Sequence, residues 1–190
     1  MTLYHYSKTQ QLTKPSVITV GSFDGVHLGH QALLQQVNEY ARKHHYQSVI
    51  ITFNPHPQEV LQNKPDFFLI NTFEQKIALF EKLGIDNVFV IPFTKELSQT
   101  TAYHFFEEYI FSKIDVKAIF IGPNHHFGKQ REGDAETLTR LCAEKEVELI
   151  MTEEFKVNEC KVRSTLIRNY LEQKDWESAE KMMGHDIMKT

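Results

Sequence analysis

Residues 20–31 read VGSFDGVHLGHQ, a glycine-rich turn that leads from an apolar run into a helical pattern. The preceding residues 17–20 are rich in β-branched side chains, as in a buried strand, whereas Leu33, Leu34 and Val37 follow at helical spacing. The first backbone N–H groups of a helix lack internal partners and carry partial positive charge. The turn is therefore predicted to bind the phosphates of a nucleotide.

Two histidines lie in the first turn of this predicted helix. His27 and His30 are three positions apart, a spacing that lets both rings point the same way. The helix dipole disfavours an imidazolium at this end, so helix stabilisation does not explain the pair. Gly29 between them has no side chain, which leaves room for a ligand near the backbone. We expect the two rings to face phosphate oxygens.

Composition limits the classes of function that fit. The chain has 190 residues and a formal net charge of −4, and its 21 Lys and Arg are dispersed, which argues against nucleic-acid binding. The two cysteines, Cys142 and Cys160, are too few for a disulfide framework and indicate a reducing cytoplasm. No apolar run approaches the roughly 20 residues of a membrane span, and no signal pattern opens the chain. We expect one cytoplasmic domain over residues 1–190, without a membrane partner.

Short apolar runs alternate with helical patterns along the whole chain, which is typical of an α/β fold with a mostly parallel central sheet flanked by helices. Strands are predicted over 16–20, 48–52, 87–92, 118–122 and 147–151, and helices over 27–44, 72–83, 101–112, 135–145, 164–172 and 175–183. Residues 155–162 indicate a short hairpin or an extended excursion. Ligands of such sheets bind beyond the carboxyl ends of the strands, where segments 21–29, 53–66 and 122–134 begin.

Three further segments have a marked pattern. Residues 51–59 read ITFNPHPQE, where two prolines beside His56 stiffen the loop and are expected to exclude a helix. Residues 121–129 read IGPNHHFGK after a predicted strand, and residues 163–168 read RSTLIR at a predicted helix start.

Together with the turn, these segments resemble the bacterial FAD synthetases of the nucleotidyltransferase superfamily, in the same order and over nearly the whole chain. The resemblance implies a Rossmann-like nucleotidyltransferase fold and an FMN adenylyltransferase that converts Mg-ATP and FMN into FAD and pyrophosphate. That family usually continues into a riboflavin kinase module. We therefore expect this chain to make FAD from FMN without phosphorylating riboflavin, or to be part of a longer protein.

The resemblance also implies roles for individual residues. Those of the catalytic step are His27, His30 and Arg168. Those of ATP binding are Gly21, Ser22, Phe23, Asp24, Gly29, Asn124, Ser164 and Thr165. Those of flavin binding are Phe53, Asn54, Pro55, His56 and Pro57. Asp24 either orders the turn or holds Mg²⁺ through water, and Ser164 and Thr165 are also good helix N-caps, so these alternatives stay open.

Two positions depart from the family pattern. His125 stands where phenylalanine is usual, and we expect the polar ring to alter the packing of its loop. Arg163 stands where serine is usual, and we expect its extra charge to attract the triphosphate. Two other functions remain open: an adenylyltransferase for another phosphorylated acceptor, and a flavin or nucleotide sensor without turnover. The sequence indicates neither the metal ligands nor the oligomeric state.

Overall fold

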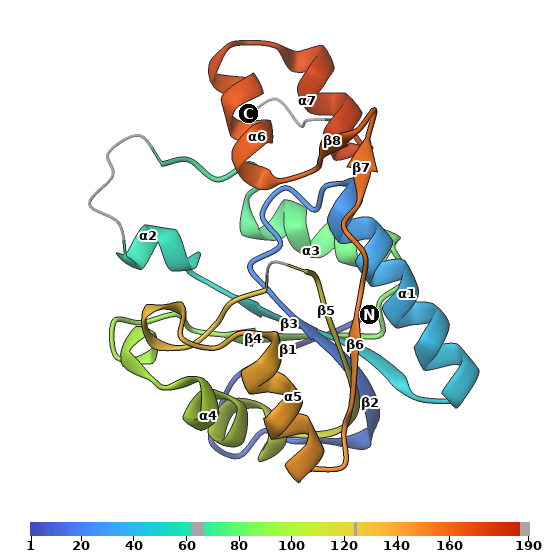
Figure 1. Cartoon of the computed structure of the whole chain (residues 1–190), viewed down its shortest axis with the longest axis vertical. Coiled ribbons are helices and arrows are strands. Elements are labelled where there is room, and N and C mark those ends of the chain that lie inside the picture. Colours follow the sequence, from blue (N-terminus) through green and yellow to red (C-terminus); the bar gives the residue numbers. More distant parts are fainter. Residues whose placement is uncertain (62–66, 124, 187–190) are drawn as a thin grey trace.

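A parallel sheet forms the centre of the molecule in the computed structural model, which describes residues 1–61, 67–123 and 125–186 (Figure 1). Its six strands run in the order β1-β4-β3-β2-β5-β6, and every pairing is parallel. The strands are β1 Thr2–His5, β2 Leu12–Val20, β3 Gln47–Phe53, β4 Asn87–Ile91, β5 Ile114–Ile121 and β6 Glu148–Met151. The chain winds to one side of β2 through β3 and β4, and to the other through β5 and β6. The predicted α/β class is confirmed.

Apart from α2, which was not predicted, the helices agree closely with the expected ranges. They are α1 Leu28–His44, α2 Pro57–Leu61, α3 Phe73–Lys82, α4 Ala102–Phe105, α5 Ala135–Glu144, α6 Ser164–Glu172 and α7 Trp176–Met183. A π-helix, Phe106–Phe111, continues α4, and short 3₁₀ turns cover Leu97–Gln99 and Lys129–Arg131. The strands β7 Lys156–Val157 and β8 Cys160–Lys161 form an antiparallel hairpin where one was predicted.

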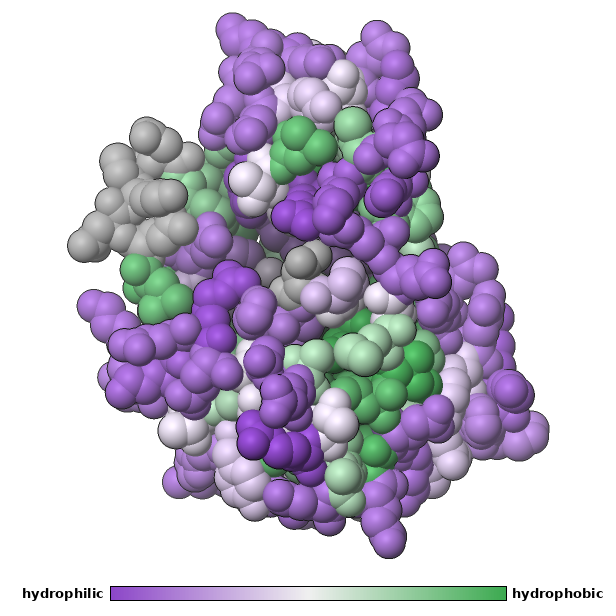
Figure 2. Space-filling model, viewed as in Figure 1, coloured by the Kyte–Doolittle hydropathy of each residue, from purple (hydrophilic) through white to green (hydrophobic). Residues whose placement is uncertain are grey.

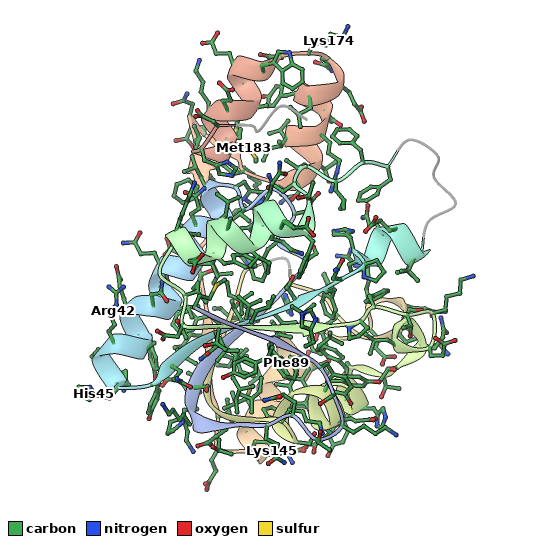
Figure 3. The ribbon with its side chains drawn as sticks, turned by 180° about the vertical axis from the view of Figure 1, so that it is seen from behind. Arg42, His45, Phe89, Lys145, Lys174 and Met183 are labelled. Atoms are coloured by element: carbon green, nitrogen blue, oxygen red, sulfur yellow. The ribbon has the colours of Figure 1, made fainter. Side chains whose placement is uncertain are left out.

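The helices cover both faces of the sheet because successive strand residues point to opposite sides. Ile50 of β3 packs with Leu34 of α1 and Phe80 of α3 on one face. Its neighbour Ile51 packs on the other face with Phe106 of the π-helix, in the cluster that also holds Phe89, labelled in Figure 3. The largest fully buried side chains therefore form two apolar layers, one on each side of the sheet.

The C-terminal helices form a separate cluster beyond the carboxyl ends of the strands. Ile167 of α6 and Ala179 and Met183 of α7 pack together and against Ile70, which precedes α3. Figure 1 shows these helices at the top of the view, above the sheet, and Figure 3 places Met183 on the side of them that faces the sheet. These helices thus lie over the carboxyl edge of the sheet.

The surface in Figure 2 is hydrophilic over most of its area, with apolar side chains gathered beside β6, where Met151 is exposed. Within the three described ranges, none of the helices has the length and apolar character needed to cross a bilayer. Neither Cys142 nor Cys160 forms a disulfide.

Two local predictions were incomplete or wrong. The strand β1 was not predicted, because it is short, mostly exposed and paired on one side only, with β4. The prediction that prolines exclude a helix around His56 was wrong, since α2 begins at Pro57. Proline suits the first position of a helix, where its missing N–H would have had no partner in any case.

Candidate functional site

A cavity of about 980 Å³ opens at the carboxyl edge of the sheet. It lies at the point where the strand order reverses between β2 and β5, the usual place for ligands in such sheets. Its lining comes from the segments after β2, β3, β4, β5 and β6 and from the start of α6. Of the residues proposed from the sequence, the lining includes Gly21, Ser22, Phe23, His27, Gly29, His30, Phe53, His56, Pro57, Ser164 and Thr165.

The turn between β2 and α1 has a strained backbone. Phe23 and Val26 adopt φ angles of 51° and 39°, in the left-handed region, and Gly25 lies at 85°. Such conformations cost roughly 1–3 kcal/mol for a residue with a branched or bulky side chain. Both side chains are nonetheless buried, so the surrounding contacts must hold the turn in this shape.

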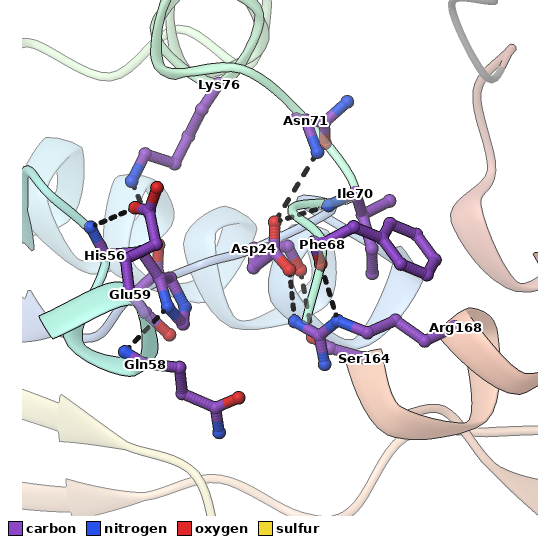
Figure 4. A network of polar contacts seen from close by, with 11 residues as sticks. Asp24, His56, Gln58, Glu59, Phe68, Ile70, Asn71, Lys76, Ser164 and Arg168 are labelled. Atoms are coloured by element: carbon purple, nitrogen blue, oxygen red, sulfur yellow. Dashed lines mark hydrogen bonds and ion pairs between the residues drawn. The ribbon is translucent and has the colours of Figure 1, made fainter. Parts of the chain in front are cut away.

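Asp24 is the centre of the contacts that hold the turn (Figure 4). Its buried carboxylate forms an ion pair with Arg168 and accepts the N–H groups of Ile70 at 3.0 Å and Asn71 at 3.5 Å. Its backbone oxygen accepts the Ser164 hydroxyl at 2.9 Å. Burial raises the pKa of Asp24, and the Arg168 charge and the two N–H groups offset part of this rise. Of the two open alternatives, the contacts favour Asp24 as the residue that orders the turn.

The last described residues hold the same turn from above. Gln31 Nε2 donates to the Val26 oxygen at 2.8 Å and to the Met183 oxygen at 2.7 Å. His185 Nε2 lies 3.0 Å from the Gly25 oxygen. Gln31 thus links the Val26 carbonyl to the end of α7, and His185, just after α7, contacts the Gly25 carbonyl.

Arg168 lies beside this turn and not along the cavity wall. Besides its ion pair with Asp24, its Nε donates to the Phe68 oxygen at 3.1 Å, and its guanidinium lies 4.7 Å from the centre of the Phe67 ring. The structure likewise places Asp24, Asn54 and Pro55 outside the cavity lining. Asn124 lies outside the described residues, so its place is not given.

The two histidines of the turn are stacked face to face. Their ring centres are 3.6 Å apart, at an angle of 12° between the planes. His27 is the N-cap of α1, because its Nδ1 accepts the backbone N–H of His30 at 3.3 Å. The His30 ring also meets the edge of Phe23, and its buried Nδ1 has no hydrogen-bond partner within the described part of the chain.

These contacts determine the charge of the pair. Burial lowers the pKa of His27 to about 4, and burial together with the charges of His27 and Lys76 lowers the pKa of His30 well below its usual value. Both rings are therefore neutral at pH 7. Since Nδ1 of His27 accepts a hydrogen bond, its proton resides on Nε2, which is left as a donor for a ligand oxygen.

The wall after β3 combines an aromatic side chain with a second buried histidine. Phe53 lines the cavity and packs against Phe93, with ring centres 5.5 Å apart. His56 Nδ1 accepts the backbone N–H of Gln58 at 3.1 Å, while the backbone N–H of His56 donates to Glu59 Oε2 at 2.8 Å (Figure 4). Burial, then the charges of Lys76 and Arg168, lower the pKa of His56 to about 4. His56 thus caps α2 in a neutral form.

The loop after β5 brings His125 to the cavity. Its Nε2 is buried without a hydrogen-bond partner among the residues that the structure describes, and its ring centre lies 5.5 Å from that of Phe127. Burial, then the charges of His126 and Arg131, lower the pKa of His125 to about 4. The departure from phenylalanine therefore leaves an aromatic ring packed on Phe127, with one polar atom unsatisfied.

The free energy of unfolding is expected to fall as the pH drops from about 6.5 to 4. In this window His27, His56 and His125 stay neutral in the fold, whereas the same residues take up protons when the chain unfolds. Each of these histidines contributes a slope of roughly 1.4 kcal/mol per pH unit. His125→Phe removes one of them, so urea unfolding between pH 7 and 4.5 should show a shallower slope. An unchanged slope would contradict the buried neutral state of His125.

The second departure, Arg163, is paired with a carboxylate. Its Nη2 lies 2.8 Å from Glu154 Oε1, and Lys161 lies 2.6 Å from the other oxygen of Glu154. The Arg163 side chain is 51% exposed, and its expected pull on a triphosphate is therefore reduced both by this neighbour and by solvent.

Arg163→Ser is expected to raise the KM for ATP by no more than about fivefold at low salt, since exposed pairs contribute roughly 0–1 kcal/mol. The difference should disappear as salt screens the charge. Steady-state rates at several salt concentrations check this. A large rise in KM that persists at high salt would mean that Arg163 binds ATP directly.

Three groups of residues at the cavity were missed by sequence reasoning. Phe93 and residues 97–100 line it from the segment after β4, and the carboxyl end of the predicted strand 87–92 was a signal for them. Residues 152–155 line it, and the carboxyl end of the predicted strand 147–151 was a signal for them. Lys76 lies on α3 behind the cavity and is 6% exposed. Lys76 lies at helical spacing between Phe73 and Phe80, on the apolar face of the helix. This spacing could have indicated from the sequence that its charge is buried.

Comparison with known proteins gives consistent results. A family model described as FAD synthetase matches residues 9–166. The bifunctional riboflavin kinase/FMN adenylyltransferase of Buchnera aphidicola subsp. Schizaphis graminum is 31% identical over 176 residues, which are 92% of this chain and 56% of that protein. The chain thus spans little more than half the length of this relative.

Solved structures agree with the fold. A structure described as a macrolide-efflux protein from Streptococcus pneumoniae superposes with a TM-score of 0.84 at 26% identity, over 98% of this chain and 61% of that one. Pantothenate synthetase from Thermus thermophilus has a TM-score of 0.52 at 15% identity, over 95% of this chain and 71% of that one, and bears on the fold alone. The Rossmann-like nucleotidyltransferase fold is confirmed.

The family match extends over the strained turn, the loops after β3, β4, β5 and β6, and the start of α6, which together line the cavity. Since this is well over half of the sequence, the chain belongs to the FAD synthetase family.

Proposed function

We propose that residues 1–190 act as one FMN adenylyltransferase domain, which transfers the adenylyl group of Mg-ATP to FMN. An oxygen of the FMN phosphate attacks the α-phosphorus in line, the bond from that phosphorus to the β-phosphate oxygen breaks, and FAD and pyrophosphate are the products. The stacked pair His27 and His30 at the start of α1 is the observation on which the proposal depends.

The pair stabilises negative charge on the phosphates during the transfer. His27 Nε2–H and the first N–H groups of α1 are donors that stand ready before the reaction begins, and preorganised donors are effective where charge develops. Because both histidines are neutral at pH 7, they contribute oriented dipoles and not full charges. No covalent intermediate is required.

The two substrates divide the cavity between them. ATP phosphates lie over the turn at Gly21, Ser22 and Gly29, next to Ser164 and Thr165, and the flavin ring packs on Phe53 and Pro57. A volume of about 980 Å³ is at the upper end of the range for ligand pockets, which suits two bound nucleotides. Small-molecule substrates, and no nucleic acid, are the proposed partners, in the cytoplasm.

Mg²⁺ is proposed to enter as part of the ATP substrate. Within the described residues, no three His, Cys, Asp or Glu side chains are placed to hold a metal ion, and the Asp24 carboxylate is already bound by Arg168. The described residues therefore do not form a resident metal site.

The experiment is incubation of the purified chain with ATP, Mg²⁺ and a panel of phosphorylated acceptors, followed by chromatography. FMN should give FAD and pyrophosphate, and omission of ATP should give neither. Adenylylation of a different acceptor with none of FMN would favour the alternative enzyme. Binding of FMN and ATP without any product would favour a sensor.

A further inference from the structure

Lys76 forms hydrogen bonds to two segments that line the cavity, although its own side chain lies outside the lining. Its Nζ donates to the Ser22 oxygen at 3.1 Å, to Thr52 Oγ1 at 3.3 Å and to the Phe53 oxygen at 3.4 Å. Ser22 belongs to the turn after β2, whereas Thr52 and Phe53 form the end of β3. One ammonium group therefore links the proposed phosphate side of the cavity to the proposed flavin side.

The charge of Lys76 is unusual for its position. The residue is 6% exposed, and no carboxylate among the described residues lies within 4 Å of its Nζ to form an ion pair. An ion buried among neutral oxygens is costly, whereas an apolar side chain at this place in α3 would add to the core. Burial lowers the pKa of Lys76 to about 8, and the Asp24 and Glu59 charges offset part of this effect. At pH 7 it is still mostly protonated.

The titratable groups that face Lys76 come from four segments. Asp24 of the turn and Glu59 of α2 act to raise its pKa. His30 of α1 and His56 before α2 feel its charge, which lowers the pKa of both rings. Burial is the larger cause of the neutral state of both rings, and the Lys76 charge adds to it. The same charge attracts an anion to the cavity.

We propose that Lys76 is a positioning residue that ties the phosphate turn to the end of β3 and supplies a fixed positive charge behind the cavity. This proposal rests on the proposed function, in which both substrates are anions. Neutral hydrogen-bond donors would be enough to link the turn to the end of β3. The buried positive charge of Lys76 is therefore explained by something else, and attraction of an anionic ligand in the cavity explains it.

The test compares three variants of the whole chain. Lys76→Met removes both the donors and the charge, and Lys76→Gln keeps N–H donors without the charge. Lys82→Met is the control, because Lys82 lies exposed near the end of the same helix. Far-UV and near-UV circular dichroism show whether each variant folds. If Lys76→Met does not fold, Lys76→Gln and the titrations of the unmodified chain below still decide the question.

The first measurement is ATP binding by calorimetry from pH 7 to 9.5. In the unmodified chain the Kd for ATP should rise several-fold as the pH passes about 8, where Lys76 loses its proton. In Lys76→Gln the Kd should be weaker at pH 7, by roughly tenfold, and flat over the same range. A purely structural tie predicts only a small change with pH, because the neutral amine keeps two of its three N–H donors. Identical profiles for Lys76→Gln and Lys82→Met would overturn the proposal.

The second measurement is an NMR titration of the histidine rings without any ligand. Removal of the Lys76 charge should raise the pKa of His56 from about 4 toward its ordinary value, and Lys82→Met should leave it unchanged. A His56 pKa that does not move in Lys76→Gln would also overturn the proposal. The two hypotheses are tested separately. An absence of FAD synthesis in the unmodified chain contradicts the proposed function, whereas the titrations test only the role of Lys76.

Discussion

His27→Asn is expected to lower kcat for FAD formation by roughly 10²-fold or more while the fold stays intact. The ring of His27 has two tasks: Nδ1 caps α1, and Nε2 is left as a donor toward the cavity. Asparagine is among the best N-cap residues, so it keeps the first task and loses the second. Removal of one preorganised donor from a developing charge costs about 10²–10³-fold in rate. Steady-state assays of FAD formation measure the loss.

The control lies at the other end of the same helix. His45 follows α1 with a φ of 57°, a conformation that asparagine adopts readily, so His45→Asn should retain both fold and rate. His30→Ala should lose activity on the same scale as His27→Asn, because the two rings form one stack. Normal rates in both active-site variants would show that the histidines are structural only.

Asp24→Ala is expected to lower the free energy of unfolding by roughly 3–5 kcal/mol, the cost of stranding a buried charge. Arg168, whose side chain is 14% exposed, would keep its positive charge without a counter-ion. The N–H groups of Ile70 and Asn71 would also lose their acceptor, and the strained turn at Phe23 and Val26 would lose its central contact. Urea unfolding at pH 7 gives the value.

Two comparisons make this result specific. Asp115→Ala breaks an exposed pair with Lys117 and should cost less than about 1 kcal/mol. The double variant Asp24→Ala with Arg168→Met removes the stranded charge and should recover part of the loss. If Asp24→Ala were as mild as Asp115→Ala, the ion pair would not be what holds the turn, and Arg168 would be available for the phosphate role that the sequence suggested.

The sequence could predict those parts of the site that depend on the order of strands, turns and helices along the chain. A β-branched strand, a glycine-rich turn and a helical pattern specify where the helix N-terminus lies, and parallel strands bring their carboxyl ends to one edge. For this reason His27, His30, Phe53 and Ser164 meet in one cavity as expected. Their chemical roles remain predictions until the variants are measured.

The parts that sequence could not predict depend on tertiary partners. Nothing in the pattern of residues 163–168 indicates that Arg168 turns toward Asp24, because the choice between a carboxylate and a phosphate depends on geometry. The same holds for Ser164, which was a plausible N-cap; instead Arg163 takes the N-cap position without a side-chain bond, and the Ser164 hydroxyl reaches the Asp24 backbone. Short motifs specify which groups are present, whereas packing decides what they touch.

The way in which the strained turn is held has a consequence for the order of events during synthesis. Its partners Ser164, Arg168 and His185 lie between 140 and 160 positions away along the chain. The strands β2 to β5 are complete by residue 121, so the centre of the sheet can pair on the ribosome well before these partners exist. A nascent chain with its sheet formed still lacks the contacts that fix Phe23 and Val26, and the proposed nucleotide site becomes the last region of the molecule to reach its final shape.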